Sequence, residues 1–240
     1  MNKILYLTKL FFLIPLCITT GYTQNDQAIT FIEKLEKTYM NAKMLSFDGN
    51  IKYYTEVNSN SPIEIMMISY RREGKKIHIV IGDQTVVYDG KMNIVINESE
   101  KKIYVSSNKP PKNNKLFPAA LASDYLKTGM FNLSVEDYLG DKRRITLTEK
   151  DKTVSSSIVF ISQKNTNFIE FARMIIDKED EEANKKINKK KFEFSYYNYK
   201  TVFSEFDKID VSKYVIKVKK GKITTYKALG QLSNFQIIVI

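Results

Sequence analysis

Side chains able to do acid–base, nucleophilic or metal chemistry are scarce in this chain of 240 residues. It contains one histidine, His78, and one cysteine, Cys17. These counts exclude histidine triads, zinc sites with several histidines and sites with several thiolate ligands. His78 lies between Ile77 and Ile79, so in a strand it points away from their face, and we interpret it as a surface or core-edge residue. We predict no metal site.

Carboxylates offer another route to catalysis. Asp89, Asp177 and Asp210 lie at predicted strand ends or turns, and paired carboxylates can hydrolyse glycosides. Aspartates in turns, however, commonly bond to the local backbone. The chain also lacks tryptophan, which disfavours sugar stacking, although 15 tyrosines could substitute. We therefore predict that the protein is not an enzyme and has neither catalytic residues nor a cofactor.

Residues 1–23 have the pattern of a cleavable signal peptide. Two lysines and no acid precede the apolar run Leu10–Ile18, and small residues at positions 21 and 23 would allow cleavage before Gln24. Cys17 lies in this run, but the bulky Leu16 before it does not fit a lipoprotein signal. We predict an exported chain that is not lipidated.

The remaining residues, 24–240, are predicted to form a single domain without cysteine. Loss of the two signal lysines lowers the net charge from +11 to +9. For an exported protein such a surface favours anionic lipid headgroups or acidic polymers as partners, and not nucleic acid. The mixed charges of Lys178–Lys190 are typical of a solvated hairpin tip. The oligomeric state is left open.

Hydrophobic periodicity predicts two helices and two groups of strands. Residues Asp26–Lys43 repeat apolar side chains every three or four positions, and Phe117–Lys127 reads as a short helix after a proline-containing loop. Alternation and turn residues predict strands at Ser46–Val57, Ile63–Arg72, Lys76–Ile81, Thr85–Tyr88, Met92–Asn97 and Lys102–Ser106. Further strands are predicted at Arg144–Thr148, Val154–Ser162, Phe168–Asp177, Lys191–Tyr199, Lys213–Lys219 and Asn234–Ile240.

Three segments of this layout resemble the outer-membrane lipoprotein carriers, the LolA-like family. They are the helix ending in Tyr39 with the strand Leu45–Tyr54 after it, the turn Val87–Lys91 ahead of Ile94–Ile96, and Ile175–Asp177 ahead of Phe192–Tyr199. The sequence departs from the family pattern in two ways. The usual glycine after the aspartate is replaced by the insertion Lys178–Lys190, and no arginine near the first strand matches the family's cavity arginine.

The resemblance implies a periplasmic lipid or lipoprotein carrier with an α+β, mainly β fold. Its sheet would be a curved antiparallel half-open barrel, with helices covering the concave face and acyl chains held in an apolar cavity. The residues expected to line that cavity are Phe47, Ile51, Tyr53, Ile65, Met67, Ile79, Ile94, Leu121, Phe160, Met174 and Phe194.

Two alternatives remain beside this expectation. Any one of the lining residues could instead belong to an ordinary packed core. The protein could also be a non-enzymatic assembly or protein-binding module of the cell envelope that uses a sheet edge or the loop Ser106–Pro118.

Overall fold

The structure is a computed structural model that describes residues 24–107, 131–150, 157–178, 188–202, 209–220 and 223–240. Within these ranges the chain is mainly β, with one α-helix, α2 (Gln24–Asn41), before the first strand. Ile32, Leu35 and Tyr39 are buried on one side of α2, as the periodicity predicted. The signal segment and the predicted helix Phe117–Lys127 lie outside the described residues. No described helix has the length and hydropathy needed to cross a membrane.

Two meanders follow α2. The first consists of β1 (Met44–Tyr54), β2 (Glu64–Glu73), β3 (Lys76–Ile81), β4 (Gln84–Tyr88), β5 (Asn93–Asn97) and β6 (Lys102–Ser106). The second consists of β7 (Phe131–Tyr138), β8 (Lys142–Glu149), β9 (Ser157–Gln163), β10 (Ile169–Lys178) and β11 (Asn188–Lys200). Strand β7, in which apolar and polar residues alternate, was not predicted.

The chain ends in a segment that we call the C-terminal module, residues 211–240. It contains the 3-10 helices η3 (Val211–Lys213) and η4 (Gly230–Leu232). Its strands are β12 (Val215–Lys220), β13 (Ile223–Ala228) and β14 (Gln236–Val239). Strands β12 and β13 form a separate two-stranded sheet, of which only β12 was predicted.

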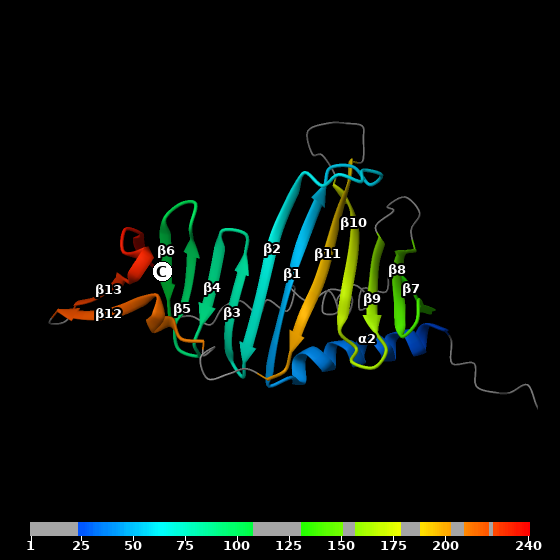
Figure 1. Ribbon diagram of the computed structural model, residues 1–240, viewed down its shortest axis with the longest axis horizontal. Coiled ribbons are helices and arrows are strands. Elements are labelled where there is room, and N and C mark those ends of the chain that lie inside the picture. The colour runs from blue at the N-terminus through cyan, green and yellow to red at the C-terminus, as the bar shows by residue number, and fades with distance from the viewer. Residues whose placement is uncertain (1–23, 108–130, 151–156, 179–187, 203–208, 221–222) are drawn as a thin grey trace, which may run out of the picture.

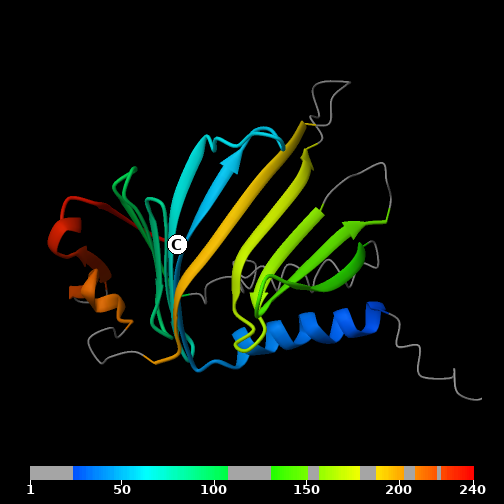
Figure 2. The same cartoon turned by 45° about the vertical axis from the view of Figure 1, so that its right-hand side comes forward.

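Twelve strands make one large sheet in the order β14-β6-β5-β4-β3-β2-β1-β11-β10-β9-β8-β7. The two meanders meet where β1 pairs with β11, and every pairing is antiparallel except that of β14 with β6. The predicted wholly antiparallel sheet was therefore wrong at this edge. The sheet is strongly curved and its two ends stay apart, with α2 beside the β7 end and the C-terminal module beside the β6 end (Figures 1 and 2).

The two faces of the sheet carry separate hydrophobic cores. Phe47 pairs with Tyr70 across β1 and β2, and both pack with α2, which defines what we call the α2 face. Strands β1 to β3 and β7 to β11 contribute to this core. On the opposite face, which we call the hairpin face, the C-terminal module packs on β4 to β6. Buried Ile94 belongs to this second core.

Candidate functional site

Seven of the eleven predicted lining residues share the α2 face. The register of neighbouring strands places their side chains on one side, because directly paired residues point to the same face. Ile51 pairs with Phe194 of β11, and Phe194 pairs with Ala172 of β10. The seven are Phe47, Ile51, Tyr53, Ile79, Phe160, Met174 and Phe194.

The seven divide into two groups by exposure. Phe47, Ile79, Phe160 and Met174 are buried in the core beneath α2. The other three are only half-buried. With two half-buried neighbours they make a continuous apolar surface, which we call the open strip: Ile51, Tyr53, Met66, Phe192 and Phe194.

Contacts within the open strip follow from the strand register. Ile51 lies between Phe194 on one side and Met66 on the other. Tyr53 stacks on Phe192 with ring centroids 5.0 Å apart. Aromatic faces and a thioether therefore surround one branched aliphatic side chain, and methionine adapts readily to ligands of irregular shape.

Four predicted lining residues do not join this surface. Ile65 and Met67 are 57% and 56% exposed and point to the hairpin face, since the α2 face of β2 is occupied by Met66 and Ile68. Ile94 is buried in the core under the C-terminal module. Leu121 lies outside the described residues.

A hydrogen-bonded pair of tyrosines fixes α2 to the sheet. The Tyr199 hydroxyl donates to the Ile169 carbonyl at 2.6 Å, and the Ile169 amide donates to the Tyr39 hydroxyl at 2.8 Å. The two hydroxyl oxygens are 3.1 Å apart, so Tyr39 donates to Tyr199, whose own proton is already used. Burial raises the pKa of Tyr39 to about 12. Both hydroxyls therefore stay neutral, and they anchor the helix.

An arginine holds the same, C-terminal end of α2. The Arg72 guanidinium donates to the carbonyls of Tyr39 and Ala42. These carbonyls lie where a helix has no backbone partner for its last acceptors. The position of α2 is therefore set by polar contacts at its C-terminal end and by apolar packing against the core.

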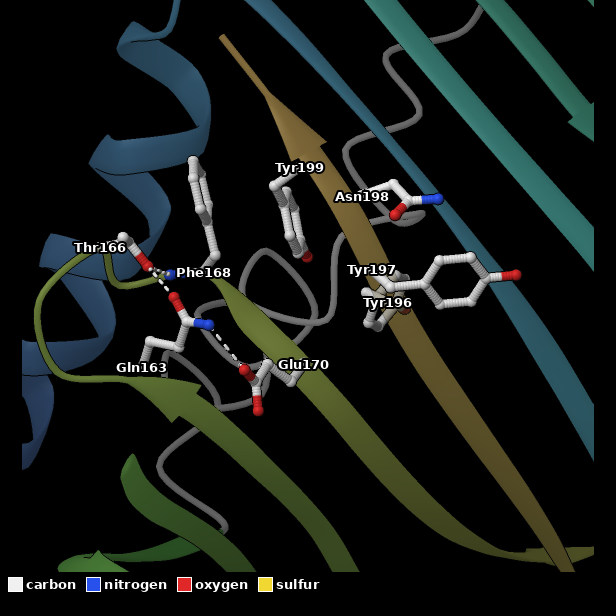
Figure 3. Close-up of a pocket in the computed structure, with 8 residues that line it drawn as sticks. All are labelled: Gln163, Thr166, Phe168, Glu170, Tyr196, Tyr197, Asn198 and Tyr199. Atoms are coloured by element: carbon white, nitrogen blue, oxygen red, sulfur yellow. Dashed lines mark hydrogen bonds between the residues drawn. The ribbon is translucent and has the colours of Figure 1, made fainter. Parts of the chain in front are cut away.

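A depression of about 580 Å³ lies next to the tyrosine pair and is bordered by Tyr199 (Figure 3). Gln163 donates to Glu170 at 2.6 Å and accepts from Thr166 at 2.7 Å. Burial tends to raise the pKa of Glu170, but hydrogen bonds from Lys142 and Gln163 leave it lowered. The depression is lined by Gln163, Thr166, Phe168, Glu170, Tyr196, Tyr197, Asn198 and Tyr199.

None of the residues lining this depression was singled out from the sequence. The signal that could have indicated it is the run Tyr196–Tyr199, three tyrosines and an asparagine at the end of a strand. Asn198 has a φ of 56°, so the regular alternation of side chains between the two faces of the strand is interrupted there. Tyrosines on either side of Asn198 therefore line the same depression.

Two of the three aspartates considered as catalytic carboxylates hold turns, and the third, Asp177, lies in β10. Asp89 accepts from the amides of Lys91 and Met92, each at 2.9 Å. Asp210 caps η3 by accepting from the Ser212 amide at 2.8 Å. Within the described residues, no three histidine, cysteine or acidic side chains gather closely enough to hold a metal ion.

Comparison with known proteins gives similarity in structure only. No family model and no curated protein matches the sequence. A LolA superfamily protein from Nitrosomonas europaea is 10% identical, with a TM-score of 0.32 over 76% of this chain and 97% of its own. The LolA-like family is also the one that the sequence resembles.

Two further solved structures are similar at comparable levels. The Mycobacterium tuberculosis lipoprotein LppX is 12% identical, with a TM-score of 0.38 over 77% of this chain and 98% of its own. A DUF1329 family protein from Desulfovibrio piger is 9% identical, with a TM-score of 0.34 over 73% of this chain and 92% of its own.

Proposed function

We propose that this protein is an exported periplasmic carrier that binds the acyl chains of lipids or lipoproteins on the α2 face. The observation that carries the proposal is the open strip. It continues the apolar surface of a closed core, yet its side chains are only half-buried. Contiguous exposed apolar surface is unfavourable in water and marks a site that something covers.

The energetics of an acyl chain fit a surface of this kind. Each buried methylene is worth about 0.8 kcal/mol, so a chain of about sixteen carbons loses on the order of 12 kcal/mol when it leaves a membrane. The carrier must return most of this. A row of three aromatic rings, with Ile51 and Met66 beside them, supplies apolar contact in which the Tyr53 hydroxyl is the one polar side-chain group.

A matched pair of substitutions tests the proposal. Ile51→Asp puts a charge in the open strip, whereas Ile65→Asp makes the same chemical change on the hairpin face at an exposed position. We expect Ile51→Asp to abolish displacement of a fluorescent fatty acid and Ile65→Asp to leave it unchanged. Equal effects of the two variants, or no saturable binding by the unmodified protein, would contradict the proposal.

The bound partner can be identified directly. Native mass spectrometry of protein purified from its own host should show co-purifying lipid or lipoprotein. A protein partner in stoichiometric amount, without lipid, would instead favour an envelope assembly module. Intact-mass measurement of the same sample should give a chain that begins at Gln24 without an acyl adduct.

A further inference from the structure

The positive charge of this protein is concentrated in one small part of the chain. Residues 211–240 contain six lysines and no aspartate or glutamate. Their net charge of +6 is more than half of the +11 of the whole chain. The 187 residues from 24 to 210 carry a net charge of only +3. In the main sheet basic groups pair with acids, for example Lys142 with Glu170 at 2.6 Å and Arg144 with Glu136 at 3.1 Å. The C-terminal module has no acid of its own to do this.

The lysines of the module are presented by the hairpin β12–β13. Val215 and Ala228 at its base are buried against β4 to β6. Further along the strands Lys217, Lys219 and Lys227 are exposed. Lys217 pairs with Tyr226, and Lys227 pairs with Ile216, so the hairpin carries lysines on both of its faces. The buried base holds this charged hairpin beside the β6 end of the sheet (Figures 1 and 2).

Exposed aliphatic side chains accompany these charges. Ile216 is 40% exposed on the same face of the hairpin as Lys227, and Val239 of β14 is 62% exposed. A polymer of acidic groups would be recognised by charge alone. Lysines interleaved with exposed aliphatic groups match a surface that is anionic at its headgroups and apolar just beneath them.

We propose that the hairpin β12–β13 docks the protein on anionic membrane surfaces. Ile216 enters the boundary between headgroups and acyl chains, with Lys227 on its own face of the hairpin and Lys217 and Lys219 on the other face contacting the headgroups around it. This end of the sheet lies away from α2 (Figure 1), so docking does not require that the open strip bind lipid, and the two activities can fail separately.

Vesicle binding tests the docking. The probes are vesicles of phosphatidylcholine with and without phosphatidylglycerol, and the variant is Lys217→Gln/Lys219→Gln/Lys227→Gln. Each lysine near an anionic surface contributes about fivefold in affinity, so the triple variant should bind anionic vesicles on the order of 100-fold more weakly. The control Lys34→Gln/Lys37→Gln/Lys91→Gln removes the same charge at exposed positions outside the module. Its affinity for anionic vesicles should fall only a few-fold.

Two further readouts complete the test. Binding of the unmodified protein should weaken steeply as salt rises, because exposed charges are screened over about 8 Å at physiological ionic strength, and this holds even if the triple variant fails to fold. Fatty-acid displacement by the triple variant should be unchanged. Equal binding to neutral and anionic vesicles, equal losses in both triple variants, or binding to heparin without binding to vesicles would overturn the docking proposal.

Discussion

Replacing three side chains of different exposure by alanine should give three different losses of stability. Phe160 is 0% exposed and packs in the core under α2, so Phe160→Ala should cost about 3 to 5 kcal/mol through cavity formation. Phe194 is half-buried in the open strip, so Phe194→Ala should cost about 1 to 2 kcal/mol, because less packing is lost. Met67 is exposed on the other face, and Met67→Ala should change stability by less than about 0.5 kcal/mol.

Urea melts of the three variants measure these costs, and an unchanged m-value in each confirms that unfolding remains comparable. The same proteins should differ in acyl-chain affinity. If the Phe194 ring covers about two methylenes, its loss weakens binding by about 1.5 kcal/mol, or roughly tenfold. A loss of stability for Phe194→Ala as large as that for Phe160→Ala, with unchanged fatty-acid affinity, would refute the reasoning, since the open strip would then be filled core.

Three further perturbations address the parts that hold this surface in place. Tyr199→Phe leaves the Ile169 carbonyl and the Tyr39 hydroxyl each short of a partner and should cost about 1 to 3 kcal/mol in urea melts, whereas Tyr197→Phe, at an exposed residue, should cost almost nothing. Gly49→Ala brings a methyl group against the Ser195 carbonyl oxygen and the Tyr196 ring. It should lower the free energy of unfolding by about 1 to 3 kcal/mol, because β1 must move away from β11. An unchanged urea melt would contradict this contact. Burial, and then the charges of Arg71 and Lys213, lower the pKa of His78 from 6.5 in the folded protein. As pH falls, His78 therefore takes up a proton in the unfolded chain before it does so in the folded one. The free energy of unfolding should thus decrease as pH drops through and below about 6.5. His78→Gln should flatten that pH dependence, and an equally steep profile would show that other groups cause it.

The sequence predicted the strands well because most of them have clear turn residues at both ends. Strands β3 and β6 have the predicted bounds, and the others that were predicted differ by a few residues at their ends. The curved mainly β sheet was confirmed. Strand β7 was missed because its apolar positions alternate with residues that also suit a loop, and β13 because its six residues, ITTYKA, do not alternate clearly between apolar and polar.

The face on which a residue lies was predicted less well, for a physical reason. In β2 the run Ile65–Ile68 is apolar at every position, so alternation does not tell which half points inward, and Met66 rather than Met67 lies on the α2 face. In β5 the residues Ile94, Val95 and Ile96 raise the same ambiguity, and the C-terminal module settles it by covering Ile94. Packing against a distant part of the chain decides which face of the sheet such a residue occupies. The local sequence pattern carries no information about that packing.

The pairing of β1 with β11 has a consequence for how the chain folds. Neighbours within each meander are joined by short local connections, whereas β1 and β11 are separated by roughly 140 residues, for example Ile51 and Phe194. The entropy of closing so long a loop must be overcome before that pairing returns any energy, which slows folding. We expect each meander to collapse early and the two to join in a later, rate-limiting step.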